Sequence, residues 1–265
     1  MSTRQANLLR RGWRNVREAG TRRLILTALL IAASLGVGYF SWELPVTASA
    51  ERALYDARLY VEANRRAVDQ DPRVVLVVFD DQTLIRARKR SPLDRGILAE
   101  ALRNLDSLGP KAIGIDILFD QPQDEDEELI ATLRRMSTPV VVGYATLATN
   151  EGDIVWEQQQ YLDRFMARLE GSRATLGSVR LDDIYGVTRR FPSIEPGLPP
   201  TLGRGMLTAA GEAGRTLPGY EGAIRYRLNK YKGEPIAPAL PIDNFLDDGL
   251  MAVPEGRALL RQRIA

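Results

Sequence analysis

The chain has 265 residues, of which 45% are hydrophobic and 26% are charged, as in an ordinary folded globular protein. It contains neither cysteine nor histidine, which excludes disulfides, a thiolate nucleophile, Ser-His-Asp hydrolysis and zinc sites built from Cys or His. The formal net charge is +2. Residues 1–23 carry seven arginines and one glutamate, a balance of +6, so the remaining residues sum to −4. A basic tail on a mildly acidic body is unlike a nucleic-acid-binding domain, so we expect no nucleic-acid partner.

An uncharged apolar segment follows the basic tail. It runs for nineteen residues from Leu24 to Trp42 (LILTALLIAASLGVGYFSW), and about twenty apolar residues cross the hydrocarbon core of a bilayer as a helix. Because arginine-rich flanks stay in the cytoplasm, we expect a cytoplasmic tail over 1–23, a transmembrane helix over 24–42 and an exported domain over 43–265. In a bacterium this means a single anchor in the inner membrane, with the main domain periplasmic or extracellular.

Two other interpretations of the apolar segment stay open. A cleaved signal peptide is supported by Ala48-Ser49-Ala50, an A-x-A cleavage pattern, and faintly by Thr21-Arg22-Arg23. The apolar core of a signal peptide is usually only ~7–15 residues long, however. A buried helix of a soluble protein would rarely be uncharged on all sides over this length. We therefore favour an uncleaved anchor.

The exported region begins with a predicted helix over 46–69, which ends before Asp71-Pro72 because the residue before proline disfavours helix. Val74–Phe79 (VVLVVF) is a β-branched apolar run typical of a strand buried on both faces. A helix opened by Ser91-Pro92 and closed by Gly109-Pro110 follows it.

A second strand is predicted over Ala112–Phe119, a second helix over Asp124–Met136 and a third strand over Val140–Val142. This alternation indicates an α/β fold with a mostly parallel sheet and helices on both faces. The signal is weaker beyond residue 150, where we expect mixed strands and one helix. The strands are Ile154–Trp156, Ala174–Arg180 and Ile224–Leu228, and the helix is Leu202–Ala213.

Acidic residues lie where the predicted strands end. Asp80 and Asp81 follow the first strand and Asp120 follows the second. Ligands of open parallel sheets bind beyond the carboxyl ends of the strands, and carboxylates there can hold Mg²⁺ or Ca²⁺ through oxygen ligands. The alternative is structural, since such acids often cap the next helix or solvate a turn. These residues are a candidate ligand site, and we expect no other cofactor.

Asp116 lies inside the predicted strand 112–119, and burying an unpaired carboxylate is costly. We expect Asp116 to pair with Arg95 at the start of the preceding helix, and we include both residues in the candidate ligand site. The acidic run Asp124–Glu128 (DEDEE) is interpreted as a solvated helix start rather than a calcium loop.

Several segments also follow one another in the order of a known family. They are LYDARL (Leu54–Leu59), PRVVLVVFDD (Pro72–Asp81), SPLDR (Ser91–Arg95), AIGIDILFD (Ala112–Asp120) and GSVRLDDIYGVTRRFP (Gly177–Pro192). On these segments, residues 45–265 resemble the CHASE sensory domains of the second type, extracellular input modules associated with bacterial cyclases and histidine kinases. Arg90-Ser91 departs from the family, which often has an aromatic residue before its Pro-Arg turn.

The resemblance implies an input domain without catalysis of its own. It would sense a small-molecule or environmental stimulus, act as a homodimer and signal through membrane helices to a class III adenylate or guanylate cyclase or a kinase. Family members usually continue with a glycine-ended strand, more membrane helices and that effector, so we expect such a continuation beyond Ala265. An exported metal-dependent hydrolase using Asp80, Asp81 and Asp120, and a structural cell-envelope module, stay open as alternatives.

Overall fold

The computed structural model describes residues 20–40, 45–88, 93–148, 154–181, 183–184, 186–193 and 195–264. The chain divides into two compact units, Met1–Arg65 and Arg66–Ala265.

The first unit contains two long helices, α2 (Thr21–Phe40) and α3 (Pro45–Arg65). Helix α2 has 20 residues and none of them is buried within the chain. At a rise of about 1.5 Å per residue it is about 30 Å long, the thickness of the hydrocarbon core. By length and composition α2 can cross a membrane, and an N-terminal signal sequence would have the same properties. Trp42, the predicted end of the segment, lies outside the described residues.

The second unit is built around a three-stranded parallel sheet in the order β2-β3-β4. The strands are β2 (Ile113–Ile115), β3 (Val140–Tyr144) and β4 (Ala174–Ser178). Helix α6 (Asp126–Arg135) connects β2 to β3, and helix α7 (Trp156–Ala167) connects β3 to β4. The register places Ile113 beside Val140 and Val140 beside Ala174. The predicted strand–helix–strand alternation is therefore confirmed in this part of the chain.

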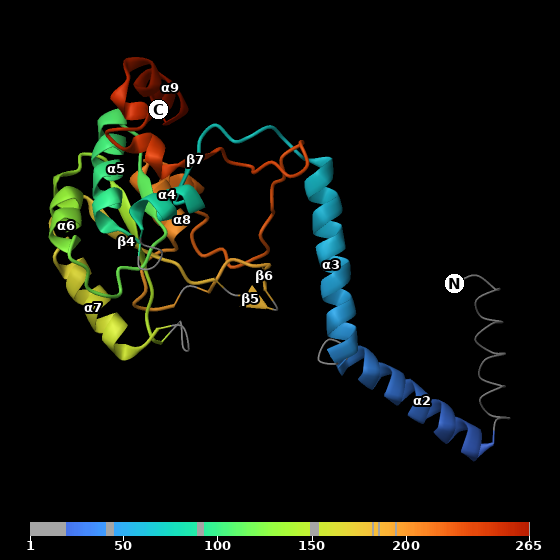
Figure 1. Ribbon diagram of the computed structural model, residues 1–265. Helices are drawn as coiled ribbons and strands as arrows, with labels where there is room; N and C mark the ends of the chain where they lie inside the picture. Colours follow the sequence, from blue (N-terminus) through green and yellow to red (C-terminus); the bar gives the residue numbers. More distant parts are fainter. Residues whose placement is uncertain are drawn as a thin grey trace. The chain divides into compact units, whose positions relative to one another are not determined.

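Helices cover both faces of this sheet, as the sequence predicts (Figure 1). On one face, Val140 and Val142 belong to the buried core together with side chains of α5 (Arg95–Leu108), α6 and α7. On the other face lies α8 (Leu202–Ala209). Its Gly205 is so close to β3 that an added Cβ would lie 2.9 Å from Val141 Cγ1. Alternate residues of β3 thus point to opposite layers.

The remaining elements lie around this centre. Strand β1 (Leu76–Val78) pairs in parallel with β7 (Ala239–Pro241) in a separate two-stranded sheet, and β5 (Asp183–Ile184) pairs antiparallel with β6 (Val187–Thr188). The predicted first strand is therefore shorter than VVLVVF and belongs to a different sheet. The other elements are α4 (Asp81–Ala87), η1 (Ala213–Arg215), η2 (Ile242–Phe245), η3 (Leu250–Ala252) and α9 (Pro254–Ile264).

Two predicted strands are wrong. Helix α7 begins at Trp156, where a strand was expected, and its buried residues Leu162, Phe165 and Met166 recur at helical spacing. Residues 224–228 form no ladder either, although single bridges flank them at Ala223 and Asn229. Without a regular neighbouring strand, this stretch of alternating apolar and charged residues has no ladder to join.

Several boundaries also differ from those expected. The helix predicted over 202–213 ends at Ala209 and is followed by the separate turn η1. Helix α5 begins at Arg95, capped by the Asp94 side chain, which accepts from the backbone N–H groups of Gly96 and Ile97. The expected start at Ser91-Pro92 lies outside the described residues.

Candidate functional site

Asp80 and Asp81, at the end of β1, serve the start of α4. Oδ1 of Asp80 accepts hydrogen bonds from the Thr83 backbone N–H at 2.8 Å and from the Thr83 hydroxyl at 3.0 Å. These bonds cap the helix, and they hold the pKa of Asp80 below its ordinary value. Asp81 lies exposed in the first turn. Asp80 thus has the capping role that the sequence left as the structural alternative.

Arg95 is deeply buried, with only 2% of its surface exposed. Its guanidinium forms an ion pair with Asp126 and donates a hydrogen bond of 2.7 Å to the Gln121 carbonyl. The guanidinium carbon also lies 5.1 Å and 5.5 Å from the ring centroids of Phe119 and Phe165. A buried cation is stable in such surroundings because its charge is balanced and both of its terminal nitrogens donate hydrogen bonds.

Asp126 completes this buried cluster. It accepts hydrogen bonds from the Tyr161 hydroxyl and from the Gln123 backbone N–H. The predicted pairing of Arg95 with Asp116 is therefore wrong. Strand β2 ends at Ile115, so Asp116 leaves the sheet and is exposed, whereas packing of α5 against α6 buries Asp126 beside Arg95.

Asp120, after β2, accepts a hydrogen bond of 2.5 Å from the Gln158 side chain of α7. The five predicted site residues thus have separate surroundings: Asp80 caps α4, Asp81 and Asp116 are exposed, and Arg95 and Asp120 have partners inside the fold. Among the residues that the structure describes, no group of three or more acidic side chains could hold a metal ion. Binding of Mg²⁺ or Ca²⁺ stays a prediction.

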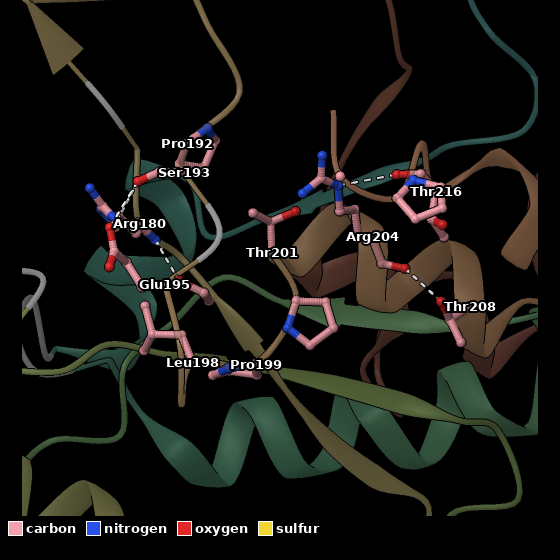
Figure 2. A pocket seen from close by; sticks show the side chains of 14 residues that line it. Arg180, Pro192, Ser193, Glu195, Leu198, Pro199, Thr201, Arg204, Thr208 and Thr216 are labelled. Atoms are coloured by element: carbon pink, nitrogen blue, oxygen red, sulfur yellow. Dashed lines mark hydrogen bonds and ion pairs between the residues drawn. The ribbon is translucent and has the colours of Figure 1, made fainter. Parts of the chain in front are cut away.

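The structure contains a cavity of about 290 Å³ at a different strand end (Figure 2). It lies where β4 ends at Ser178 and where α8 begins after Thr201. A single parallel bridge joins these two residues, and the Ser178 backbone N–H donates to the Pro200 carbonyl at 2.8 Å. The lining residues are Ser178, Arg180, Pro192, Ser193, Glu195, Leu198, Pro199, Pro200, Thr201, Arg204, Thr208, Thr216, Pro218 and Gly219.

On one side of the cavity, Arg180 pairs with Glu195. The Arg180 guanidinium lies 3.0 Å from Glu195 Oε1, and the Ser193 hydroxyl donates to the same oxygen at 2.9 Å. The hydrogen bond from Ser193, followed by that from Arg180, holds the pKa of Glu195 below its ordinary value. This carboxylate is therefore ionised near neutral pH and balances one of the two arginines in the cavity.

On the other side lies Arg204, which is only 9% exposed. Its Nε donates to the Thr216 carbonyl at 3.1 Å, and its Nη2 donates to the carbonyls of Leu217 and Tyr220. The guanidinium carbon lies 5.5 Å from the ring centroid of Phe191. Within the described part of the chain, Arg204 has no carboxylate partner.

The start of α8 also borders the cavity. Thr201 precedes the helix, and its side chain forms no capping hydrogen bond. The first backbone N–H groups of a helix have no partner within the helix and form the positive end of its dipole. In Figure 2, Thr201 lies between the Arg180–Glu195 pair and Arg204.

Sequence reasoning missed Arg180, Glu195 and Arg204. It applied the strand-end rule to the first two strands, where acidic residues drew attention. The same rule applied to the strand predicted over 174–180 would have pointed to Arg180, two residues after β4 ends. Arg204 and Glu195 carry no comparable signal, because loops bring them to the cavity.

Comparison with protein families identifies the chain. The model of the CHASE2 domain matches residues 25–264, nearly the whole length of the chain. This chain belongs to the CHASE2 domain family. The resemblance seen in the sequence is thus confirmed, and CHASE2 domains are extracellular sensory domains. No curated protein and no solved structure matches this CHASE2 chain significantly.

Proposed function

We propose that this CHASE2 chain is the input region of a bacterial membrane signalling protein, exposed to the periplasm and anchored in the inner membrane by α2. The observation that carries this proposal is the family match over residues 25–264, because the family is sensory. The arginine-rich segment before α2 supports the orientation, since basic flanks stay in the cytoplasm.

The output would be an adenylate or guanylate cyclase, or a kinase, encoded beyond Ala265. The chain itself offers little for catalysis, because it lacks cysteine and histidine. A sensor needs two conformations that differ in affinity for the stimulus. A homodimer would serve this purpose, since one membrane helix can pass a signal by moving relative to a second copy.

Within the domain, we place the stimulus in the cavity beside β4 and α8. It lies at the carboxyl edge of a parallel sheet, where ligands of such folds bind, and it combines apolar walls with a few charged groups. Asp80, Arg95 and Asp120 already have partners within the fold, which makes the predicted strand-end set a second choice. For the same reason, no observation favours a metal-dependent hydrolase.

The absence of cysteine from the chain permits a direct test of the orientation. Single cysteines would be introduced at Ser2 in the basic tail and at the exposed Arg225 in the second unit. A membrane-impermeant maleimide should label Arg225→Cys in spheroplasts, but label Ser2→Cys only after lysis. The reverse pattern would overturn the proposed orientation, and equal labelling of both sites would overturn an uncleaved transmembrane anchor.

The output is tested by reading the gene beyond the codon for Ala265 and by measuring cyclic nucleotides or phosphorylation from the complete protein. We expect further membrane helices followed by a cyclase or kinase domain. A reading frame without any effector domain would contradict the signalling role and favour the cell-envelope alternative.

A further inference from the structure

The charge of the cavity indicates what it binds. Among its described lining residues, the charged ones are Arg180, Glu195 and Arg204, which leaves one positive charge in excess. Arg204 is the source of this excess, because Glu195 is bonded to Arg180. A buried charge without a counter-ion is costly. An anionic ligand would supply the missing counter-ion.

Arg204 is also suitably arranged to hold an anion. Its Nε and Nη2 are bonded to the backbone carbonyls of Thr216, Leu217 and Tyr220, which fix the plane of the guanidinium. Nη1 donates to none of the described residues, so it stays available to a ligand. The face of the Phe191 ring further restricts the guanidinium. The site is thus ordered before the ligand arrives, which reduces the entropic cost of binding.

The start of α8 provides a second and independent attraction for an anion. The Thr201 hydroxyl does not cap the helix, so this hydroxyl and the N–H groups of Gly203 and Arg204 remain available near Thr201, whereas the Leu202 N–H faces the Ser178 carbonyl in the parallel bridge. A negative group near Thr201 would therefore meet a hydroxyl, helix N–H groups and the Arg204 guanidinium.

The rest of the lining indicates an organic ligand rather than an inorganic ion. Five apolar residues contribute to the walls, which a hydrated oxyanion would leave unused. They are Pro192, Leu198, Pro199, Pro200 and Pro218. A volume of about 290 Å³ lies just below the range of sites for drug-sized molecules, about 300–1,000 Å³, and so suits a small ligand.

We propose that this cavity binds a small monocarboxylate, with its carboxylate held between Arg204 and the start of α8 and its aliphatic body against the proline-rich wall. The proposal deepens the sensory function and rests on it for its biological meaning. A single negative charge matches the single positive charge in excess among the described lining residues, and Nη1 of Arg204 can donate a charge-assisted hydrogen bond to a carboxylate oxygen.

The test is calorimetric titration of the full chain, reconstituted in lipid nanodiscs, with straight-chain monocarboxylates from acetate to hexanoate. Affinity should increase with chain length until the cavity is full and then fall. Butyramide, which has the shape of butyrate without its charge, should bind at least about tenfold more weakly, because a charged hydrogen bond is worth about 1.5–3 kcal/mol.

Variants locate the binding site. Arg204→Gln should weaken carboxylate binding about 10- to 100-fold, by the same reasoning. Thr201→Val keeps the shape of the side chain and all the bonds of Arg204, and should weaken binding about three- to tenfold. Arg225→Gln removes an exposed arginine that does not line the cavity, and it should bind as the unchanged chain does. Thr201→Val gives a result even if Arg204→Gln fails to fold.

The possible outcomes separate the site from the function. Absence of binding across the series, equal binding of butyrate and butyramide, or binding that neither variant weakens would each overturn the carboxylate site. Tighter binding of inorganic phosphate than of any carboxylate would also overturn it, in favour of an oxyanion site. If carboxylates bind as expected but leave the output of the complete protein unchanged, the site stands and the sensory role fails.

Discussion

Among the residues that the structure describes, two buried arginines have opposite surroundings. Arg95 is the first residue of α5; Asp126 of α6 balances its charge, and two phenylalanine rings flank it. Arg204 is nearly as buried, but its partners are uncharged backbone carbonyls and it borders a cavity. The first arginine is satisfied within the fold, whereas the second keeps a charge that a ligand can use.

This difference separates structural charges from functional ones. An ion pair whose groups are all bonded has nothing left to offer a ligand, however conspicuous its residues are in the sequence. A buried charge held by neutral groups is poised for an external partner. The comparison therefore moves the candidate site from the acidic ends of β1 and β2 to the end of β4.

The largest loss of stability should follow from breaking the ion pair between Arg95 and Asp126. Asp126→Ala would leave the buried guanidinium of Arg95 without its ion-pair partner and leave the Tyr161 hydroxyl without its acceptor. We expect the free energy of unfolding to fall by about 3–5 kcal/mol, measured by urea denaturation. Asp124→Ala, which removes an exposed acid from the same segment, should change it by less than about 0.5 kcal/mol.

A double variant shows whether the cost comes from the stranded charge. Arg95→Met combined with Asp126→Leu removes both charges and replaces them with apolar groups. This chain should be more stable than Asp126→Ala alone, because replacing a buried ion pair by packed apolar side chains is often neutral. If the double variant is less stable than the single one, the pair contributes through its hydrogen bonds and our description of Arg95 is wrong.

The buried pair shows how far the sequence alone could lead. Arg95 lies in helical phase with Leu98 and Leu102, and Asp126 lies in phase with Leu129 and Leu133. Both charged residues thus occupy the apolar stripe of their helices, and this spacing alone predicts burial. The burial of Asp126 was not expected from the sequence, because the acidic run DEDEE as a whole is typical of a solvated helix start.

The cavity could not be predicted in the same way. Arg204 is positioned by segment 216–220, which forms no helix or strand and in which the carbonyls of Thr216, Leu217 and Tyr220 accept its hydrogen bonds. Periodicity gives no information on such a segment. The core strands and α5, α6 and α8 were predictable from apolar runs, whereas the site depends on long-range loop contacts that leave no local pattern.

Replacing Arg204 should lower the free energy of unfolding by less than replacing Asp126 does, because the hydrogen-bond partners of Arg204 are uncharged. Arg204→Gln removes hydrogen bonds to the carbonyls of Thr216, Leu217 and Tyr220, but Leu217 and Tyr220 are exposed and their carbonyls can bond to water. We expect the free energy of unfolding to fall by about 1–2 kcal/mol, measured by the same urea denaturation.

The ligand provides the control for this prediction. Saturating carboxylate should stabilise the unchanged chain, since a ligand that binds only the folded state raises its stability. It should stabilise Arg204→Gln less, by up to about 1.4–2.7 kcal/mol, the energy of a 10- to 100-fold weaker affinity. If Arg204→Gln loses as much unfolding free energy as Asp126→Ala, Arg204 is a structural residue and the contrast between the two arginines disappears.

A third set of arginine–carboxylate contacts, around Asp71, makes the stability of the fold depend on pH. Asp71 accepts hydrogen bonds from Arg73 Nη2 at 2.6 Å and from Arg227 Nη1 at 2.8 Å. The hydrogen bond from Arg73 is the largest cause that holds the pKa of Asp71 well below its ordinary value. Because this pKa is lower in the folded than in the unfolded chain, the ionised Asp71 stabilises the fold above about pH 4. This contribution is lost as the pH falls towards the folded pKa.

Asp71→Asn should therefore lower the free energy of unfolding by about 1 kcal/mol at pH 7, as expected for a surface pair. The difference from the unchanged chain should shrink as the pH falls from about 4 to about 2, because the unchanged chain then loses the same interaction. Urea denaturation of both chains at a series of pH values measures this difference in the free energy of unfolding. Arg227→Gln keeps the Arg73 bond, so its deficit at pH 7 should be smaller than that of Asp71→Asn. A difference independent of pH would show that Asp71 contributes by packing rather than by charge.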